Sequence, residues 1–211
     1  MNWINIVTTL ITSTASIIVA LIAAGFFKNW MEKFKERKSQ GKLVKQIQKD
    51  EVVHYTIREI RRKYNADRIY IMQFHNGGMF YTQAPMQKVS ITFERCSDGL
   101  ERMFERFQNV FVSHHTWYIS ESINLNMFST NIEEDVRDLP TRSLLKTFGN
   151  YALSSVPIYD SSKNLIGLLS LSWVFSEIPD EILDGNNFSE KFKEELLSES
   201  NSLQAYLYET T

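Results

Sequence analysis

The tetrapeptide His75-Asn76-Gly77-Gly78 has the residue types best suited to contacting a ligand. It follows the apolar run from Ile69 to Phe74, which predicts a buried strand. Asn and Gly adopt positive φ angles easily, so a tight turn between two strands explains three of the four residues. Alternatively, the two glycines allow backbone amides to approach a ligand, and His75 and Asn76 supply hydrogen bonds to it. We therefore take all four as candidate ligand-binding residues.

Glu94 and Trp117 are two further candidate ligand contacts. Glu94 belongs to the segment 88–95, in which polar and apolar residues alternate as they do in a strand with one buried face. The polar face either meets solvent or lines a pocket, and in the second case both side chains reach a ligand. No nucleophile or acid stands at a spacing that would make His75 catalytic, and the chain has no phosphate-binding GK[ST] loop. We expect no enzymatic activity.

Few residues of this chain are suited to binding a metal. His114 and His115 are adjacent, and neighbouring residues of a strand point to opposite faces, so both cannot easily bind one ion. Cys96 is the only cysteine, which excludes an internal disulfide and a thiolate cluster. We predict no metal and no cofactor. The net charge of −2 and the few basic residues in the predicted strands also argue against nucleic acid as a partner.

The hydrophobic pattern predicts the framework that must position these residues. It indicates a helix that ends near residue 63, strands over 69–74 and 88–95, a helix over 98–108 and a short helix over 141–148. Two clear strands, "YALSSVPIY" and "LIGLLSLSWVF", are joined by a turn-forming loop at 160–164, and an amphipathic helix follows over 187–208. The stretch 114–139 has no clear pattern. We predict one α+β domain over 42–211, with helices packed on an antiparallel sheet.

The 24 residues from Ile4 to Phe27 carry no charge. A helix of this length measures about 36 Å, enough to cross a hydrocarbon layer about 30 Å thick. Trp3 and Trp30 flank the run where interfacial aromatic residues are expected. We predict a transmembrane helix over 4–27, with the lipid bilayer as its partner. A helix buried in a protein assembly and a cleaved signal peptide are the alternatives.

The segment 28–41 is basic and adjoins the predicted membrane helix. By the positive-inside rule it places the C-terminal domain in the cytoplasm, which makes the chain a single-pass protein of a bacterial inner membrane. The same charges favour anionic lipid headgroups. The basic residues nearest the membrane are Lys28, Lys33, Lys35, Arg37 and Lys38.

Small residues recur at every fourth position of the predicted membrane helix. This spacing places them on one side, where the backbone of a second helix can approach closely. We predict a homodimer or a higher oligomer associated through this helix seam, which consists of Thr8, Thr12, Ser16, Ala20 and Ala24.

The hairpin "SVPIYDSSKNLIGLLSLSW" resembles the last hairpin of a GAF domain, with a proline in one strand and a glycine at the start of the next. The helix before "ADRIYIMQF" and the terminal helix are similar to that family as well. The resemblance implies a GAF- or PAS-like sheet flanked by helices, which binds a small molecule or a regulatory protein and is often dimeric through its first and last helices.

Two resemblances point to phage proteins. "FHNGG" followed by "QKVSITFE" is similar to membrane-anchored proteins common in phage genomes. The lysis holins of T-even bacteriophages are also similar around Pro157, Gly167 and Trp173, although they place the globular domain outside the inner membrane. We therefore expect a non-enzymatic, membrane-anchored protein whose GAF-like domain binds a ligand or partner and governs assembly of the membrane helix. A holin-like lysis protein and a structural component of a virion or membrane assembly are the alternatives.

Overall fold

The computed structural model describes residues 41–79 and 85–207. Residues 41–63 are helical, and the compact domain comprises the described residues from Lys49 onward. The predicted membrane helix 4–27, its seam and the basic residues of 28–40 lie outside the described residues. Within the described residues, no helix combines the length and the hydropathy needed to cross a membrane.

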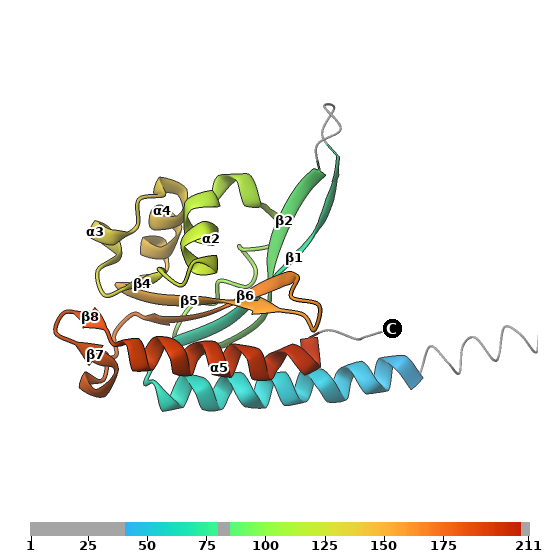
Figure 1. Ribbon diagram of the computed structural model, residues 1–211, viewed down its shortest axis with the longest axis horizontal. Helices are drawn as coiled ribbons and strands as arrows, with labels where there is room; N and C mark the ends of the chain where they lie inside the picture. The colour runs from blue at the N-terminus through green and yellow to red at the C-terminus, as the bar shows by residue number, and fades with distance from the viewer. Residues whose placement is uncertain (1–40, 80–84, 208–211) are drawn as a thin grey trace, which may run out of the picture. The chain divides into compact units, whose positions relative to one another are not determined.

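A six-stranded antiparallel sheet forms the centre of the described domain (Figure 1). The two long hairpins are β1–β2 and β5–β6, and they meet at the centre through β1 and β6. The order across the sheet is β3-β2-β1-β6-β5-β4. The strands are β1 (Arg68–Met79), β2 (Pro85–Cys96), β3 (Val110–Phe111), β4 (Phe128–Ser129), β5 (Ala152–Tyr159) and β6 (Leu165–Trp173).

Helices cover both faces of the sheet. On one face, the helix of residues 49–63 lies beside α5 (Glu190–Leu207), and Lys63 Nζ is 3.0 Å from Glu199 Oε1 (Figure 1). The other face is covered by α2 (Thr116–Ile123), α3 (Ile132–Asp135) and α4 (Leu139–Thr147). The 3-10 turns η1 (Val112–His114) and η2 (Asp180–Ile182) and a ribbon of β7 (Leu183–Asp184) and β8 (Asn187–Phe188) complete the described chain.

The alternation of side chains along the strands creates two separate cores. In β1, Ile69 and Ile71 pack against the two long helices, whereas Tyr70 and Met72 pack beneath α2–α4. This follows from the two-residue period of a strand, which sends successive side chains to opposite faces. Each fully buried aliphatic or aromatic side chain contributes about 1.5–3 kcal/mol, so both faces stabilise the sheet.

Asp67 fixes the junction between the first helix and the sheet. Its Oδ2 accepts hydrogen bonds from the backbone amides of Val174, Phe175 and Ser176 at 2.7, 2.9 and 2.8 Å, and its Oδ1 accepts one from Ser176 Oγ at 2.6 Å. The side chain is fully buried. The chain that leaves β6 is therefore held against the start of β1.

The positions of Pro157 and Gly167 in the sheet explain why the β5–β6 hairpin carries a proline and a glycine there. A Cβ atom at Gly167 would lie 2.2 Å from the carbonyl oxygen of Met72, so only glycine allows β6 to approach β1 this closely. Pro157 lies in β5 beyond the short pairing of β4 with Leu153 and Ser154, where the strand is an edge. A missing N–H therefore removes no ladder bond there.

Most of the predicted elements are present, with three differences. The segment 98–108 forms turns and no α-helix, and the short amphipathic pattern there serves to bury Met103 and Phe107. The terminal helix begins at Glu190, because Asn187 and Phe188 pair with β7. The stretch 114–139, which had no clear pattern, contains α2, β4 and α3.

Candidate functional site

His75, Asn76, Gly77 and Gly78 lie within β1, so the prediction of a tight turn at these residues is wrong. The ladder with β2 pairs His75 with Lys88 and continues past an irregularity to Met79 and Pro85. Gly78 lies within this irregularity and has a φ of 101°, a value that glycine adopts easily. Asn-Gly is a local turn signal, but pairing with the long strand β2 overrides it.

The side chains of this β1–β2 arm satisfy one another. His75 Nε2 lies 2.9 Å from Ser90 Oγ, and Ser90 Oγ accepts a hydrogen bond from the amide of Asn109 at 2.8 Å. A Cβ atom at Gly77 would come within 2.9 Å of the Lys88 side chain, so the glycine makes room for that lysine. Lys88 Nζ in turn lies 5.1 Å from the ring centroid of Phe111. A side chain at position 77 would therefore require the Lys88 side chain to move.

Glu94 is buried in a polar network at the base of β1. Its carboxylate accepts hydrogen bonds from the amides of Met103 at 2.9 Å and Phe104 at 3.0 Å, and it lies 3.3 Å from Arg68 Nε. Arg68 is fully buried and donates to Asn150 Oδ1 at 2.6 Å. Each partner here is part of the fold, so the structure places Glu94 in a structural role.

Trp117 lines a cleft of about 380 Å³ beside the edge strand β4. Helix α2 carries Trp117 and Glu121 one turn apart, so both lie on the same side of the helix. Helix α3 supplies Glu134 and Asp135, and it is capped by Asn131 Oδ1, which accepts a hydrogen bond from the amide of Glu133 at 3.1 Å. The remaining lining residues are Asn126, Met127, Phe128, Ser129, Arg137 and Asn187.

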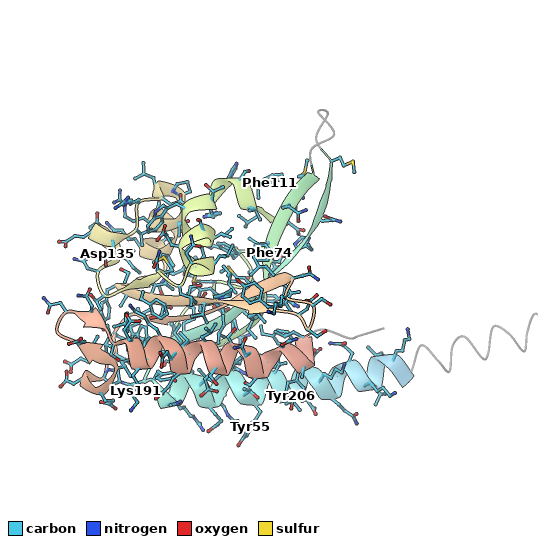
Figure 2. All side chains as sticks on the ribbon, viewed as in Figure 1. Tyr55, Phe74, Phe111, Asp135, Lys191 and Tyr206 are labelled. Carbon is cyan, nitrogen blue, oxygen red and sulfur yellow. The ribbon has the colours of Figure 1, made fainter. Side chains whose placement is uncertain are left out.

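The cleft is predominantly acidic. Its lining includes the carboxylates of Glu121, Glu134 and Asp135 and the guanidinium of Arg137. Ser129 Oγ donates a hydrogen bond of 2.8 Å to Asp135 Oδ2 and so holds that carboxylate at the rim. Figure 2 shows Asp135 on the side of the molecule covered by α2–α4.

Aromatic contacts connect this cleft with the opposite face of the sheet. Phe128, which lines the cleft, meets Phe192 of α5 edge-on, with ring centroids 6.0 Å apart. Phe192 meets Tyr64 in the same manner at 4.9 Å. Tyr64 follows directly on the helix of residues 49–63. Each aromatic pair contributes about 0.5–1.5 kcal/mol beyond its buried area. A shift of Phe128 therefore changes the packing energy of α5 and of the helix of residues 49–63.

A row of buried hydroxyls lies next to the cleft, beneath α2. Ser170 of β6 is paired across the sheet with Tyr70 of β1 and Ser155 of β5. The Tyr118 hydroxyl from α2 lies 2.9 Å from Ser170 Oγ and donates to Ser155 Oγ at 3.2 Å. Burial raises the pKa of Tyr70 and of Tyr118, so both hydroxyls stay protonated at neutral pH. The amide of Ser155 donates to the carbonyl of Met127 at 2.8 Å, which ties this row to the cleft lining.

Neither Cys96 nor the histidine pair forms a reactive centre in the described residues. Burial raises the pKa of the Cys96 thiol to about 11, which makes it a poor nucleophile at neutral pH. His115 is buried, with Nδ1 2.6 Å from Thr141 Oγ1, whereas His114 is exposed. The described residues include no group of three or more His, Cys, Asp or Glu side chains arranged for a metal ion.

The predicted site residues therefore lie at three separate places. His75–Gly78 belong to the β1–β2 arm, Glu94 to the buried network beside Arg68, and Trp117 to the cleft at the β4 edge. Sequence reasoning did not place Glu121, Glu134 and Asp135 in a ligand site, because it assigned no helices to their segment. A spacing of four residues between Trp117 and Glu121 was the available signal.

Comparison with known proteins gives a fold and no family. No family model matches the sequence, and no curated protein matches it. The GAF3 domain of a protein from Synechocystis sp. PCC6803, in its photoproduct state, is 16% identical with a TM-score of 0.53, covering 76% of this chain and 93% of its own. The described domain has a GAF-like fold.

Two further solved structures agree. The blue-light-absorbing form of the Thermosynechococcus elongatus PixJ GAF domain is 14% identical with a TM-score of 0.55, covering 77% of this chain and 89% of its own. A solved structure of a protein in its far-red-absorbing dark state, with bound biliverdin IXa, is 14% identical with a TM-score of 0.51. The match covers 78% of this chain and 94% of that chain. At such identities the likeness establishes the GAF-like arrangement of sheet and helices, and nothing beyond it.

Proposed function

We propose that this chain is a non-enzymatic, ligand-responsive membrane protein. The segment 4–27 anchors it in a bacterial inner membrane with the GAF-like domain in the cytoplasm. A small molecule binds in the Trp117 cleft, and binding changes the packing of the helix that connects the domain to the anchor. The observation that carries this proposal is that Phe128 both lines the cleft and contacts Phe192, which contacts Tyr64.

The dimensions and the position of the cleft support ligand binding. A volume of about 380 Å³ lies within the range of small-molecule sites, which is about 300–1,000 Å³. The cleft lies at the edge of the sheet, where Trp117 from α2, Phe128 from β4 and Asp135 from α3 converge. Three elements that contribute to one cleft can move relative to one another when a ligand enters.

The response follows from differential binding. A ligand shifts a conformational equilibrium only by the difference between its affinities for the two states. If the ligand fits best when Phe128 is displaced, its binding energy opposes the contact with Phe192. The contact between Phe192 and Tyr64 then changes with it, and the helix that precedes Tyr64 repacks. The seam Thr8, Thr12, Ser16, Ala20 and Ala24 would carry that change into the pairing of the membrane helices.

The outer surface of the two long helices supports self-association. Tyr55, Val52 and Tyr206 are exposed by 59%, 38% and 38%, and Figure 2 shows Tyr55 and Tyr206 on the side away from the sheet. An isologous contact between two copies would cover these apolar side chains. We therefore include a homodimer, paired through these helices and through the seam, in the proposal.

Membrane fractionation and native mass spectrometry of the intact chain test the proposal. We expect the chain in the membrane pellet. In native mass spectrometry, we expect the detergent-purified protein to release a small molecule on collisional activation. Trp117→Leu should lose that molecule. Phe175→Leu, which changes an aromatic residue that is 61% exposed and outside the cleft, should retain it.

Two results would contradict this function. A chain that remains in the supernatant without detergent has no anchor. A membrane-bound chain that carries no small molecule in the cleft, and that collapses the membrane potential when it is expressed, acts as a holin-like lysis protein instead.

A further inference from the structure

We infer that His54, Arg95 and Arg102 form a binding site for a phosphate group. The site lies where the helix of residues 49–63 meets the end of β2 and the loop that follows it. The inference goes beyond the proposed function, because this site is separate from the Trp117 cleft. Its basis is a buried imidazole nitrogen without a partner, together with two guanidinium groups that have no ion pair in the described part of the chain.

Two side-chain nitrogen atoms of the helix of residues 49–63 are buried without a hydrogen-bond partner. They are His54 Nδ1 and Arg61 Nε. The two residues are about two helical turns apart, so their side chains point to the same side of the helix. Within the described residues, one other buried nitrogen is in this condition, Arg68 Nε, and it lies 3.3 Å from the Glu94 carboxylate. Buried polar atoms nearly always have a partner, so the two helix nitrogens indicate that an acceptor is missing here.

Strand β2 brings Arg95 to the side of the sheet on which His54 lies. The His54 ring meets the Phe93 ring edge-on, with centroids 5.2 Å apart and planes at 72°. Arg95 is two residues beyond Phe93 in the same strand, so its side chain leaves the sheet on the same face. It is paired across the ladder with Ile69, which packs against the long helices. The exposed Arg95 guanidinium therefore lies on the helix side of the sheet edge.

The loop that follows β2 carries the second guanidinium. Arg61 Nη1 donates a hydrogen bond of 2.6 Å to Ser97 Oγ, which ties the start of this loop to the helix. Arg102 lies further along the loop and is exposed. The carboxylate of its neighbour Glu101 forms an ion pair with Arg106 at 3.2 Å. That acidic side chain is therefore engaged away from Arg102.

The charges around the imidazole favour an anion. Burial lowers the pKa of His54, the charge of Arg95 and that of Arg102 lower it further, and Asp50 alone raises it. Both guanidinium groups thus lie within electrostatic reach of the imidazole. Neither has an ion pair, a hydrogen bond or a ring contact in the described residues, whereas most other arginines there have one.

A phosphate group suits these donors better than a carboxylate does. Arginine binds phosphate through paired N–H groups, and the imidazole adds a further donor when it is protonated. The three side chains come from a helix, a strand and a loop, so they approach from different directions. A tetrahedral phosphate offers oxygens in several directions, whereas a carboxylate offers two oxygens in one plane. Such a ligand would link the helix of residues 49–63 to the sheet edge.

Anion binding should be coupled to the protonation of His54. A bound anion offsets the positive charges of Arg95 and Arg102, so it raises the pKa of the imidazole. A ligand that favours the protonated form binds more tightly as the pH falls, here through the range around the ordinary histidine pKa of about 6.5. Asp50 already favours the protonated imidazole, and its charge remains in place. The dependence on pH therefore reports on His54 directly.

Calorimetric titration of the intact detergent-purified protein tests the inference. Sodium sulfate is the first probe, because sulfate keeps both charges from pH 5.5 to 8, and sodium chloride holds the ionic strength constant. We expect saturable binding that is at least about threefold tighter at pH 6 than at pH 8. Arg95→Gln and Arg102→Gln change exposed side chains and should each weaken binding by about tenfold or more. His54→Gln should remove the dependence on pH.

Arg62→Gln is the matched control, because Arg62 is an exposed arginine of the same helix that pairs with Glu59 at 3.4 Å. It should leave the affinity for sulfate unchanged. Glycerol 3-phosphate and dihexanoylphosphatidic acid then show whether a soluble ester or a lipid headgroup competes better with sulfate. Sodium acetate should compete at least about tenfold less well than either.

Four results would overturn the inference. They are no saturable binding of sulfate, equal losses of affinity in Arg62→Gln and Arg95→Gln, an unchanged pH dependence in His54→Gln, and acetate that binds as tightly as sulfate. Circular dichroism and thermal unfolding of each variant establish that it is folded before it is titrated. Because Trp117 is unchanged in all of these variants, none of these results affects the small molecule expected in the Trp117 cleft.

Discussion

Replacing Asp67 by alanine is expected to be among the most destabilising substitutions of an acidic residue in this domain. The carboxylate is fully buried and accepts three backbone hydrogen bonds and one hydroxyl hydrogen bond within 2.9 Å, and a longer one of 3.5 Å from Ser97 Oγ. Alanine leaves the amides of Val174, Phe175 and Ser176 without an acceptor. It also frees the chain after β6 from the start of β1.

The magnitude follows from the number and type of these hydrogen bonds. A hydrogen bond to a charged group contributes about 1.5–3 kcal/mol net, and contributions within one network do not add fully. We therefore expect Asp67→Ala to lower the free energy of unfolding by about 3–5 kcal/mol. For a domain of this size that corresponds to a fall in Tm of about 6–20 °C. Asp67→Asn retains an acceptor but no charge, and should lower the free energy by about 1–2 kcal/mol.

The dependence on pH provides a second readout. Burial by itself raises the pKa of Asp67, but the hydrogen bonds from Ser176, Val174 and Phe175 outweigh it and bring the pKa below its ordinary value of 3.8. A group with a lowered folded-state pKa contributes its full stabilisation above the unfolded-state pKa and loses it as the pH falls through the folded-state pKa. The difference in stability between the wild type and Asp67→Asn should therefore be constant above about pH 5 and shrink below about pH 4.

Thermal unfolding of the intact protein in detergent, followed by tryptophan fluorescence to which the buried Trp173 contributes, measures these effects. Asp98→Ala is the control, because Asp98 is exposed and a surface substitution usually changes stability by less than about 0.5 kcal/mol. Equal Tm values for Asp67→Ala and Asp98→Ala would refute the reasoning. A difference between wild type and Asp67→Asn that grows as the pH falls would refute the assignment of the sign.

Three further predictions follow from the same structure. Gly167→Ala places a Cβ atom 2.2 Å from the carbonyl oxygen of Met72, so β6 must move away from β1. We expect the free energy of unfolding, measured with denaturant, to fall by about 3 kcal/mol. An unchanged denaturation midpoint would contradict the close approach of the two strands. Glu94→Gln leaves the buried Arg68 guanidinium without its counter-charge and should lower the free energy of unfolding by about 3–5 kcal/mol, whereas a neutral effect would show that Arg68 is otherwise compensated. The pKa of the Cys96 thiol is raised to about 11, so iodoacetamide should label the folded protein slowly at pH 8 and faster towards pH 11. Labelling at the rate of the denatured chain would show that the thiol is not buried.

The local sequence determined the elements whose pattern is long and regular. The β5–β6 hairpin has strands of 8 and 9 residues that are buried along nearly their whole length, and the terminal helix repeats its apolar positions over 18 residues. Such lengths make the period of the side chains unambiguous. The same reasoning found that Pro157 and Gly167 belong to one hairpin, although the reason for the glycine, the carbonyl of Met72, became visible only in the sheet.

The tertiary structure decided the short elements and the candidate site. Helices α2 and α3 have 8 and 4 residues, too few to be stable alone, and distant contacts hold them: the amide of Ile132 donates to the carbonyl of Tyr151 at 2.9 Å. His75–Gly78 read as a turn because local residue types favour one, yet pairing with β2 extends them. Glu94 and Trp117 looked alike as candidates, but burial beside Arg68 gave one a structural role and a cleft at β4 gave the other a candidate ligand contact. A side chain's neighbours come from other elements, and no local pattern encodes them.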